Sequence, residues 1–208
     1  MKSEVRSPKK NREQFIRDYI PAHALDYCLE LIGRYDFSFI LSKERQTKLG
    51  DFRRDKQKNY TITVNRNLNP YQFLITFIHE YAHLEVAVQH PGSVKAHGRE
   101  WKHTFKRLML PLLNSEIFPD DILRPLARHM RNPKAAASSD PALWKVLQRH
   151  NANAAIITLA DIAENENFIF KNRLFQKQQK KRTRVLCLEL NNGRQYLIPE
   201  IAEVKRVG

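Results

Sequence analysis

The chain has 208 residues, of which 42% are apolar and 28% are charged, a composition that supports a packed core and excludes wholesale disorder. Lysine and arginine outnumber aspartate and glutamate by 36 to 22, and the formal charge of +14 favours polyanionic partners such as nucleic acid. Two cysteines exclude a disulfide framework, while the lack of a secretory signal and of an apolar run near the roughly 20 residues that cross a bilayer predicts a cytoplasmic protein without membrane contact.

The first part of the chain predicts a helix and three strands. Residues 1–12 are polar and basic, and we expect a flexible N-terminus there. Pro21 suits the first turn of a helix, and apolar residues recur behind it at helical spacing. Segments rich in aromatic and β-branched residues predict short strands at 37–41, 47–52 and 60–65.

A long, buried helix is predicted from Pro70 to Gln89. Asn69 is a favourable N-cap, and Pro91-Gly92 prevents the helix from continuing. Because apolar residues surround this helix on all sides, it belongs in the protein interior. Further helical patterns predict helices at about 98–110, 120–130 and 141–150.

The C-terminal part follows the two-residue period of β-strands. One pair of alternating segments flanks Lys171-Asn172-Arg173, and another flanks Asn191-Asn192-Gly193. An Asn-Gly turn between alternating segments is a strong hairpin signal. We therefore expect a main domain at 13–150 and a small β-hairpin subdomain without metal at 165–208.

The buried helix carries an HExxH motif, His79-Glu80-Tyr81-Ala82-His83. Residues i and i+4 lie on one helix face, so the two imidazoles can converge on one zinc ion at about 2.0–2.1 Å. Glu80 points to one side, where it can take the proton of a zinc-bound water that attacks a peptide bond. The motif predicts a metalloendopeptidase.

A second interpretation makes His79 and His83 hydrogen-bonded core residues and leaves Glu80 solvated, since short motifs also occur by chance. The apolar character of the helix argues against it. Three polar side chains on such a helix need buried partners, and a metal ion supplies them.

A third protein ligand is expected, because a catalytic zinc site has three ligands and one open position. His97 is the candidate: Pro91-Gly92 turns the chain back towards the first helix, and Gly98 allows close backbone approach. Trp101 lies one turn beyond His97, where it either packs in the core or walls the site.

Two other histidines are rival ligands. His90 follows the helix too closely to fold back easily, and His103 projects from a different helix face than His97. Geometry therefore favours His97 over both.

Residues 70–109 resemble the SprT family of zinc metalloprotease-like proteins, which includes the Spartan DNA–protein crosslink proteases. The residues that carry the resemblance are the HExxH motif and then His97-Gly98, Trp101 and Phe105. The resemblance implies a zincin-like α+β core, in which a small sheet lies beside the HExxH helix and a second helix bears a further ligand.

The same resemblance implies roles for particular residues. It makes His79, His83 and His97 the ligands of one zinc ion and Glu80 the catalytic acid–base. It also implies hydrolysis of peptide bonds near nucleic acid. The charge of +14 and the motif together suggest that the substrates are proteins bound or crosslinked to DNA.

The sequence departs from the family at its C-terminus. Many bacterial SprT-like proteins carry a zinc ribbon of paired cysteines, whereas this region has Cys187 alone and no histidine beyond His150. The resemblance therefore implies a zinc ribbon that has lost its cysteines.

Two groups of basic residues are candidates for nucleic-acid contact or for ordinary solvated surface. The denser group lies in the C-terminal hairpin region and comprises Lys171, Arg173, Lys177, Lys180, Lys181, Arg182 and Arg184. The other lies beside the expected metal site and comprises Arg99, Lys102, Lys106 and Arg107.

Two functions follow from these features. The first is a zinc-dependent endopeptidase that acts on a protein substrate and contacts DNA or another nucleic acid through its basic surface. The alternative is a nucleic-acid-associated binding protein whose zinc site is structural or vestigial and which has no protease activity.

Overall fold

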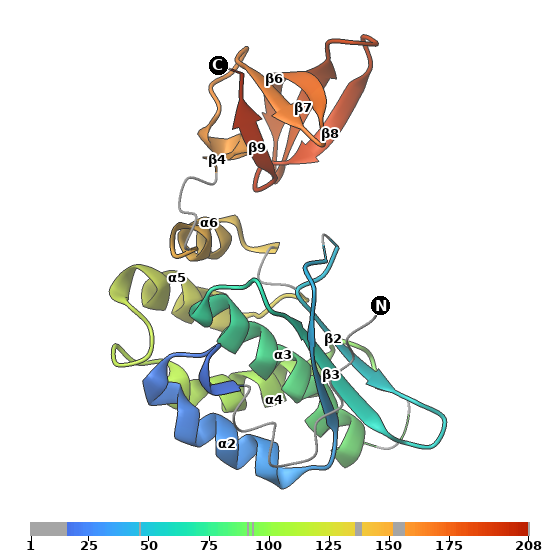
Figure 1. Ribbon diagram of the computed structural model, residues 1–208, viewed down its shortest axis with the longest axis vertical. Coiled ribbons are helices and arrows are strands. Elements are labelled where there is room, and N and C mark those ends of the chain that lie inside the picture. The colour runs from blue at the N-terminus through green and yellow to red at the C-terminus, as the bar shows by residue number, and fades with distance from the viewer. Residues whose placement is uncertain are drawn as a thin grey trace. The chain divides into compact units, whose positions relative to one another are not determined.

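The computed structural model describes residues 16–45, 47–90, 92, 94–135, 139–151 and 157–207. The chain divides into two compact units, Met1–Ala135 and Ala136–Gly208 (Figure 1). The expected flexible N-terminus and Pro91 lie outside the described residues. The sequence placed the end of the first domain at residue 150, whereas the helix α6 (Pro141–Arg149) groups with the second unit.

A three-stranded sheet forms one side of the first unit. Its strands are β1 (Ser38–Ser42), β2 (Gly50–Arg54) and β3 (Tyr60–Asn65), in the order β1-β3-β2. The central strand β3 runs parallel to β1 and antiparallel to β2. All three predicted strands are confirmed, and β2 is an edge strand of this sheet as described.

Helices cover the rest of the first unit. They are η1 (Ala22–Ala24), α2 (Leu25–Arg34), α3 (Pro70–Gln89), α4 (Arg99–Met109), η2 (Leu110–Leu112) and α5 (Asp120–Arg131). The helix α3 packs against β2, β3 and α4 (Figure 1). The predicted cap of α3 is confirmed, because the Asn69 side chain accepts the backbone N–H of Gln72 at 2.9 Å.

The core of the first unit surrounds α3. Phe73, Phe77 and Tyr81 of this helix are fully buried, and the ring of Phe39 in β1 meets those of Phe73 and Phe77 edge-on. The Tyr81 hydroxyl donates to the backbone oxygen of Leu31 at 2.6 Å, which ties α3 to α2. The polar residues of α3 therefore lie in or beside the interior, as the sequence predicted.

The second unit joins the helix α6 to a six-stranded antiparallel sheet of order β4-β9-β5-β6-β7-β8. Its elements are β4 (Ile157–Thr158), η4 (Leu159–Asp161), β5 (Asn167–Phe170), β6 (Arg173–Lys181), β7 (Arg184–Glu189), β8 (Gln195–Pro199) and β9 (Glu203–Arg206). The two predicted hairpins are β5–β6 and β7–β8, and Gly193 between the latter has the positive φ of +69° that its turn requires.

The second unit has its own apolar core. Phe168, Phe175, Val185 and Cys187 are buried together in it. Among its described residues, no histidines, cysteines and acids come together as metal ligands. The buried apolar side chains stabilise this sheet, and β4 and β9 extend it beyond the two predicted hairpins.

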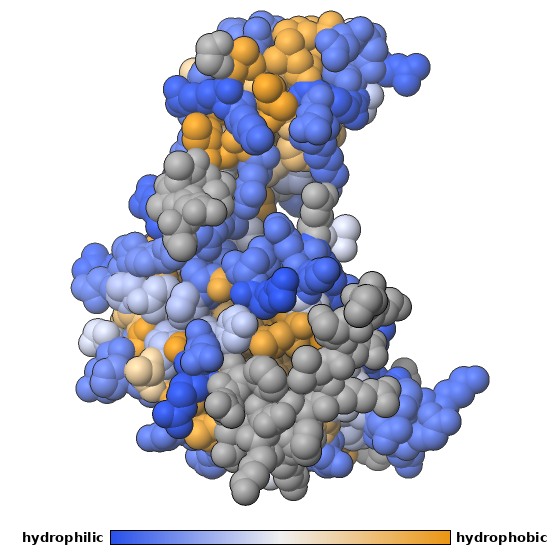
Figure 2. Space-filling view, in the orientation of Figure 1, coloured by the Kyte–Doolittle hydropathy of each residue, from blue (hydrophilic) through white to orange (hydrophobic). Residues whose placement is uncertain are grey.

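Figure 2 shows one face of the molecule. Among the residues coloured in it, hydrophilic ones predominate, and hydrophobic ones form smaller patches. No helix within the described ranges is both long enough and apolar enough to cross a bilayer.

Candidate metal centre

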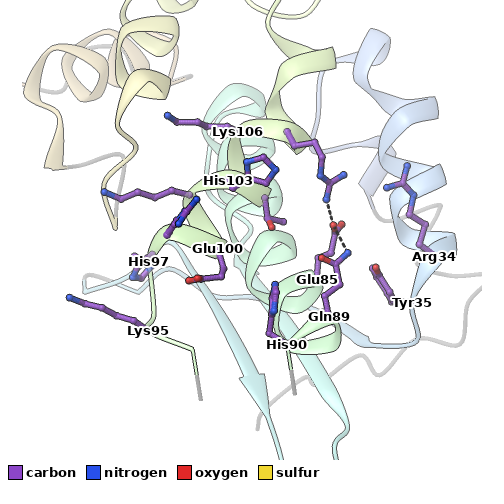
Figure 3. A pocket seen from close by; sticks show the side chains of 15 residues that line it. Arg34, Tyr35, Glu85, Gln89, His90, Lys95, His97, Glu100, His103 and Lys106 are labelled. Carbon is purple, nitrogen blue, oxygen red and sulfur yellow. Dashed lines mark hydrogen bonds and ion pairs between the residues drawn. The ribbon is translucent and has the colours of Figure 1, made fainter. Parts of the chain in front are cut away.

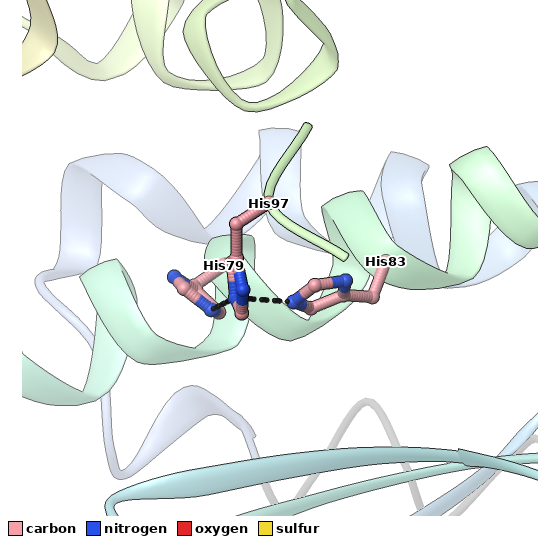
Figure 4. A group of neighbouring side chains, drawn as sticks. All are labelled: His79, His83 and His97. Carbon is pink, nitrogen blue, oxygen red and sulfur yellow. Dashed lines mark hydrogen bonds between the residues drawn. The ribbon is translucent and has the colours of Figure 1, made fainter. Parts of the chain in front are cut away.

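Three imidazoles converge between α3 and the segment that precedes α4. His79 and His83 lie one helical turn apart on the same face of α3. The His97 side chain extends from the segment opposite this face towards the two rings (Figure 4). The Nε2 atom of His97 lies 3.1 Å from Nε2 of His79 and 2.9 Å from Nε2 of His83. Of the three candidate third ligands, the structure brings His97 to the pair.

His97 reaches the pair through an unusual backbone conformation. Its φ of +57° is left-handed, which costs a residue with a Cβ atom free energy relative to glycine. Gly98 then donates its N–H to the backbone oxygen of Lys95 at 2.9 Å, and a Cβ atom at Gly98 would lie 2.8 Å from that oxygen. Gly98 thus allows a close backbone approach to Lys95, and a strained backbone such as that of His97 is typical of functional sites.

The indole of Trp101 walls the cluster. Its ring centroid lies 4.6 Å from that of His79, 4.7 Å from that of His97 and 5.4 Å from that of His83. Trp101 is 1% exposed, and its other neighbour is the stacked ring of Phe105 at 4.9 Å. The two interpretations of Trp101 therefore coincide, because its core packing fixes the positions of the three imidazoles.

Burial keeps the imidazoles uncharged. Burial, together with the neighbouring histidines, lowers the pKa of His79 well below its usual range. Burial and the nearby His97 lower the pKa of His83 to about 4, and burial also lowers the pKa of His97. At neutral pH all three rings are neutral, the form in which histidine binds a metal ion.

The cluster fits a zinc ion. The candidate ligand atoms all lie within 4.8 Å of one another. Nitrogens about 2.05 Å from a tetrahedral zinc lie roughly 3.3 Å apart, close to the two Nε2 separations in this structure. Three neutral imidazoles are also a donor set that zinc accepts in catalytic sites.

Glu80 follows His79 on α3 and lies against the edge strand β2. Its side chain is buried, and its carboxylate accepts the backbone N–H of Phe52. Burial and the nearby Asp51 raise the pKa of Glu80 to about 8, while Arg45, Lys48 and the Phe52 N–H act in the opposite direction. The carboxyl group therefore lies at the sheet edge with a pKa suited to gaining and losing a proton near neutrality.

The strand β2 also contributes to the centre in ways that the sequence analysis missed. The ring of Phe52 stacks on His83, with centroids 6.2 Å apart and planes at 13°. Gly50 lies against Glu80 with no room for a Cβ atom. The local sequence of β2 predicts only a short strand. The contacts of this strand with His83 and Glu80 of α3 become visible only in the folded chain.

A network of charges links the loop before β2 to this strand. Asp51 pairs with Lys48 at 2.7 Å and with Arg53 at 2.6 Å. The Arg45 Nε atom donates to the Asn65 side chain at 2.8 Å, which holds the loop against β3. These contacts stiffen the strand next to Glu80.

The rival ligands lie apart from the cluster. Within the part of the chain that the structure describes, the group of potential metal ligands contains neither His90 nor His103. Both side chains line a neighbouring cleft instead (Figure 3).

The basic residues of the second unit have different environments. Lys177 is buried, and its ammonium group donates to the backbone oxygens of Leu159 and Ile162 within the unit. Arg173 pairs with Glu189, and Lys180 pairs with Glu200. The remaining members of the group are exposed: Lys171, Lys181, Arg182 and Arg184.

Comparison with known proteins bears on the first unit. Residues 39–136 match the family model Peptidase_M78, described as an IrrE N-terminal-like domain. This part of the chain is similar to a zinc metallopeptidase-like family. The matched region contains β2, β3 and all but the first residue of β1, together with the HExxH motif and His97.

The match is to a different family from the SprT-like one that the sequence resembles, although the two belong to related metalloprotease classes. The broad metallopeptidase-like character is thus supported, and the SprT-like assignment stays a prediction. No curated protein and no solved structure matched the chain.

Proposed function

We propose that the first unit is a zinc-dependent metalloendopeptidase, with His79, His83 and His97 as metal ligands and Glu80 as the general acid–base. The observation that carries this proposal is the convergence of three imidazole Nε2 atoms beside a buried carboxyl group. The similarity of residues 39–136 to a zinc metallopeptidase-like family supports it independently.

The histidines and Glu80 have different roles in the proposed hydrolysis. Zinc held there would polarise the scissile carbonyl and make a water molecule more acidic. Glu80 then accepts the proton of the attacking water and delivers it to the leaving amine. Because a neighbouring cation favours the ionised form of a carboxyl group, a loaded site lowers the pKa of Glu80 and prepares it to act as the base.

The edge strand β2 offers a place for the substrate. Leu49 and Asp55 flank β2. The backbone oxygen of Leu49 accepts the N–H of Asn65 in β3, and the N–H of Asp55 donates to the backbone oxygen of Asn59, directly before β3. In an edge strand, the backbone N–H and C=O groups of alternate residues point to opposite edges. Odd-numbered residues of β2 therefore bond on the β3 side, and the backbone groups of even-numbered ones, such as Phe52, face the free edge where Glu80 lies. An extended peptide that adds to this edge as a further strand would bring its backbone to Glu80.

Metal analysis and a proteolysis assay test the proposal together. We expect nearly one zinc ion per chain in the wild type and in Glu80→Gln, because Glu80 is not a ligand. Cleavage of a denatured protein substrate should fall by about 100-fold or more in Glu80→Gln alone. A wild type purified without chelator and free of zinc would contradict the proposal.

A finer version of this function concerns DNA. We infer from the SprT-like resemblance and the charge of +14 that the substrate is a protein bound or crosslinked to DNA. The exposed cations at the β6–β7 turn, Lys181, Arg182 and Arg184, are suited to phosphate contacts.

The same exposed turn also supports the alternative function, nucleic-acid binding with a structural or vestigial zinc site. Substituting Lys181, Arg182 and Arg184 by serine should weaken DNA binding and reduce its salt dependence. The alternative predicts DNA binding that is unchanged in Glu80→Gln and no cleavage of any protein. Unchanged DNA affinity in the triple variant would exclude this turn as the binding site.

A further inference from the structure

A cleft of about 1150 Å³ lies beside the metal centre, lined by the outer face of α4 and the C-terminal ends of α2 and α3. Figure 3 shows Lys95, His97 and Glu100 on one side of it and Arg34 and Tyr35 on the other. The cleft is open to solvent, so it can admit a chain as well as a small molecule.

The cleft carries a strong excess of positive charge. Seven residues of α4 line it. Five of them recur at i, i+3, i+4, i+7 and i+8 and form one helix face, Arg99, Lys102, His103, Lys106 and Arg107, and the other two are Glu100 and Thr104. Lys95 and Arg34 add two more cations, against two acids, Glu85 and Glu100.

Most of this charge is not neutralised within the unit. Two of the six lysines and arginines are paired: Arg107 with Glu85, and Arg34 with Glu30 at 2.7 Å. Lys102 and Lys106 donate to neutral groups, the Asn132 side chain at 2.8 Å and the Arg131 backbone oxygen at 2.6 Å, and therefore keep their full charge.

Lys95 and Arg99 stand out among the cations of the cleft. Within the described ranges, neither forms an ion pair. Each lies two residues from His97, which both lines the cleft and belongs to the metal cluster. A chain that lies along the cleft therefore passes directly beside the centre where we place the chemistry.

We propose that this cleft binds an acidic segment of the protein substrate, close to the peptide bond that is cut. The proposal rests on the proposed endopeptidase function, and it specifies the substrate class of that site. From Arg99 to Lys106 the helix rises about 10 Å, the length of about three residues of extended peptide. Two or three consecutive aspartates or glutamates can thus meet the cations of α4.

The lining favours a polypeptide over a single-stranded nucleic acid. Proteins that bind single strands present aromatic side chains on which bases stack, and apart from histidines the cleft lining offers one aromatic ring, Tyr35. Glu85 and Glu100 also interrupt the positive lining, which a uniformly charged phosphate backbone tolerates less well than a short acidic peptide.

Binding is measured in the Glu80→Gln protein, so that cleavage does not interfere. The probes are a fluorescent peptide with four consecutive glutamates beside an apolar stretch and its twin with four glutamines. We expect the acidic peptide to bind about 10-fold more tightly at low salt, with the difference shrinking as salt rises.

A pair of variants with equal net charge locates the site. Lys95→Gln/Arg99→Gln should reduce the affinity for the acidic peptide by roughly 5-fold and leave the neutral peptide unaffected. The control, Arg124→Gln/Arg128→Gln, removes two exposed charges of α5 outside the cleft and should change neither affinity. Zinc content of both variants checks that the neighbouring His97 still holds the metal.

Several results would overturn the proposal: equal affinities for the two peptides, equal effects of the two double variants, or stronger competition for the cleft by single-stranded oligothymidylate than by the acidic peptide. The last result would assign the cleft to nucleic acid. Selective acidic-peptide binding in a protein whose wild type cleaves nothing would instead leave the cleft as proposed and remove the endopeptidase function.

Discussion

Gly50 of β2 and Glu80 of α3 are in contact so close that a Cβ atom at position 50 would lie 2.7 Å from Glu80 Oε1. The same Cβ atom would lie 2.6 Å from Cγ2 of Thr76, one turn earlier on α3. The edge strand therefore fixes the position of the carboxyl group on which the proposed chemistry depends.

Replacing Gly50 by alanine should displace Glu80 without touching a metal ligand. We expect Gly50→Ala to lower kcat/KM by roughly 10- to 100-fold, because small displacements of a catalytic group cost about that much. Zinc content should stay at the wild-type level. Proteolysis rates measured beside zinc content separate this effect from loss of the metal.

Gly33→Ala is the matched control for this substitution. Gly33 lies in α2, and a Cβ atom there meets nothing within 4 Å. Alanine in a helix is favoured over glycine by about 1 kcal/mol, so this variant should be slightly more stable and fully active. Full activity in Gly50→Ala would show that the contact with Glu80 does not matter.

The left-handed backbone at His97 predicts different stabilities for two variants that both lack the imidazole. His97→Ala and His97→Gly should each lose zinc affinity, by at least about 100-fold. The metal-free glycine variant should be more stable than the alanine variant by about 1 kcal/mol, because only glycine adopts a φ of +57° without strain. Denaturant unfolding of the two metal-free proteins measures the difference, and equal stabilities would show that the backbone relaxes.

Much of the centre was predictable from local sequence. The positions of His79 and His83 follow from the four-residue spacing on a helix whose start Asn69 and Pro70 define. The apolar surface of that helix correctly predicted its burial. His97 was predicted because Gly98 marks a close backbone approach, and the structure brings its Nε2 to 2.9 Å from that of His83.

The contribution of β2 was not predictable in the same way. Gly50 and Glu80 are far apart in the sequence, and no local pattern shows that Gly50 of β2 faces Glu80 of α3. Lys177 is a further example. A lysine within a basic segment is expected at the surface. Because side chains of a strand alternate between its two faces, however, Lys177 of β6 points into the unit and donates to two backbone oxygens.

Metal removal should act on one unit of the chain. A ligand that binds the folded state stabilises it by about 2.7 kcal/mol at a free concentration of 100 times its Kd. Chelation should therefore increase hydrogen exchange at the buried amides of α3. Among the described residues of the second unit, no group of side chains could hold a metal ion. The amides of β7 in this unit should therefore exchange at an unchanged rate. Equal acceleration in α3 and β7 would contradict a zinc site confined to the first unit.

The depressed pKa values of the histidines predict how the metal-free protein responds to acid. His83 has a pKa of about 4 when folded and near 6.5 when unfolded, so the unfolded chain binds more protons between these values. The free energy of unfolding should therefore fall as the pH is lowered from about 6.5 to 4. His83→Gln removes this titration and should give a flatter profile in the same window. Urea unfolding at several pH values compares the two, and parallel profiles would show that the buried imidazole of His83 does not carry the effect.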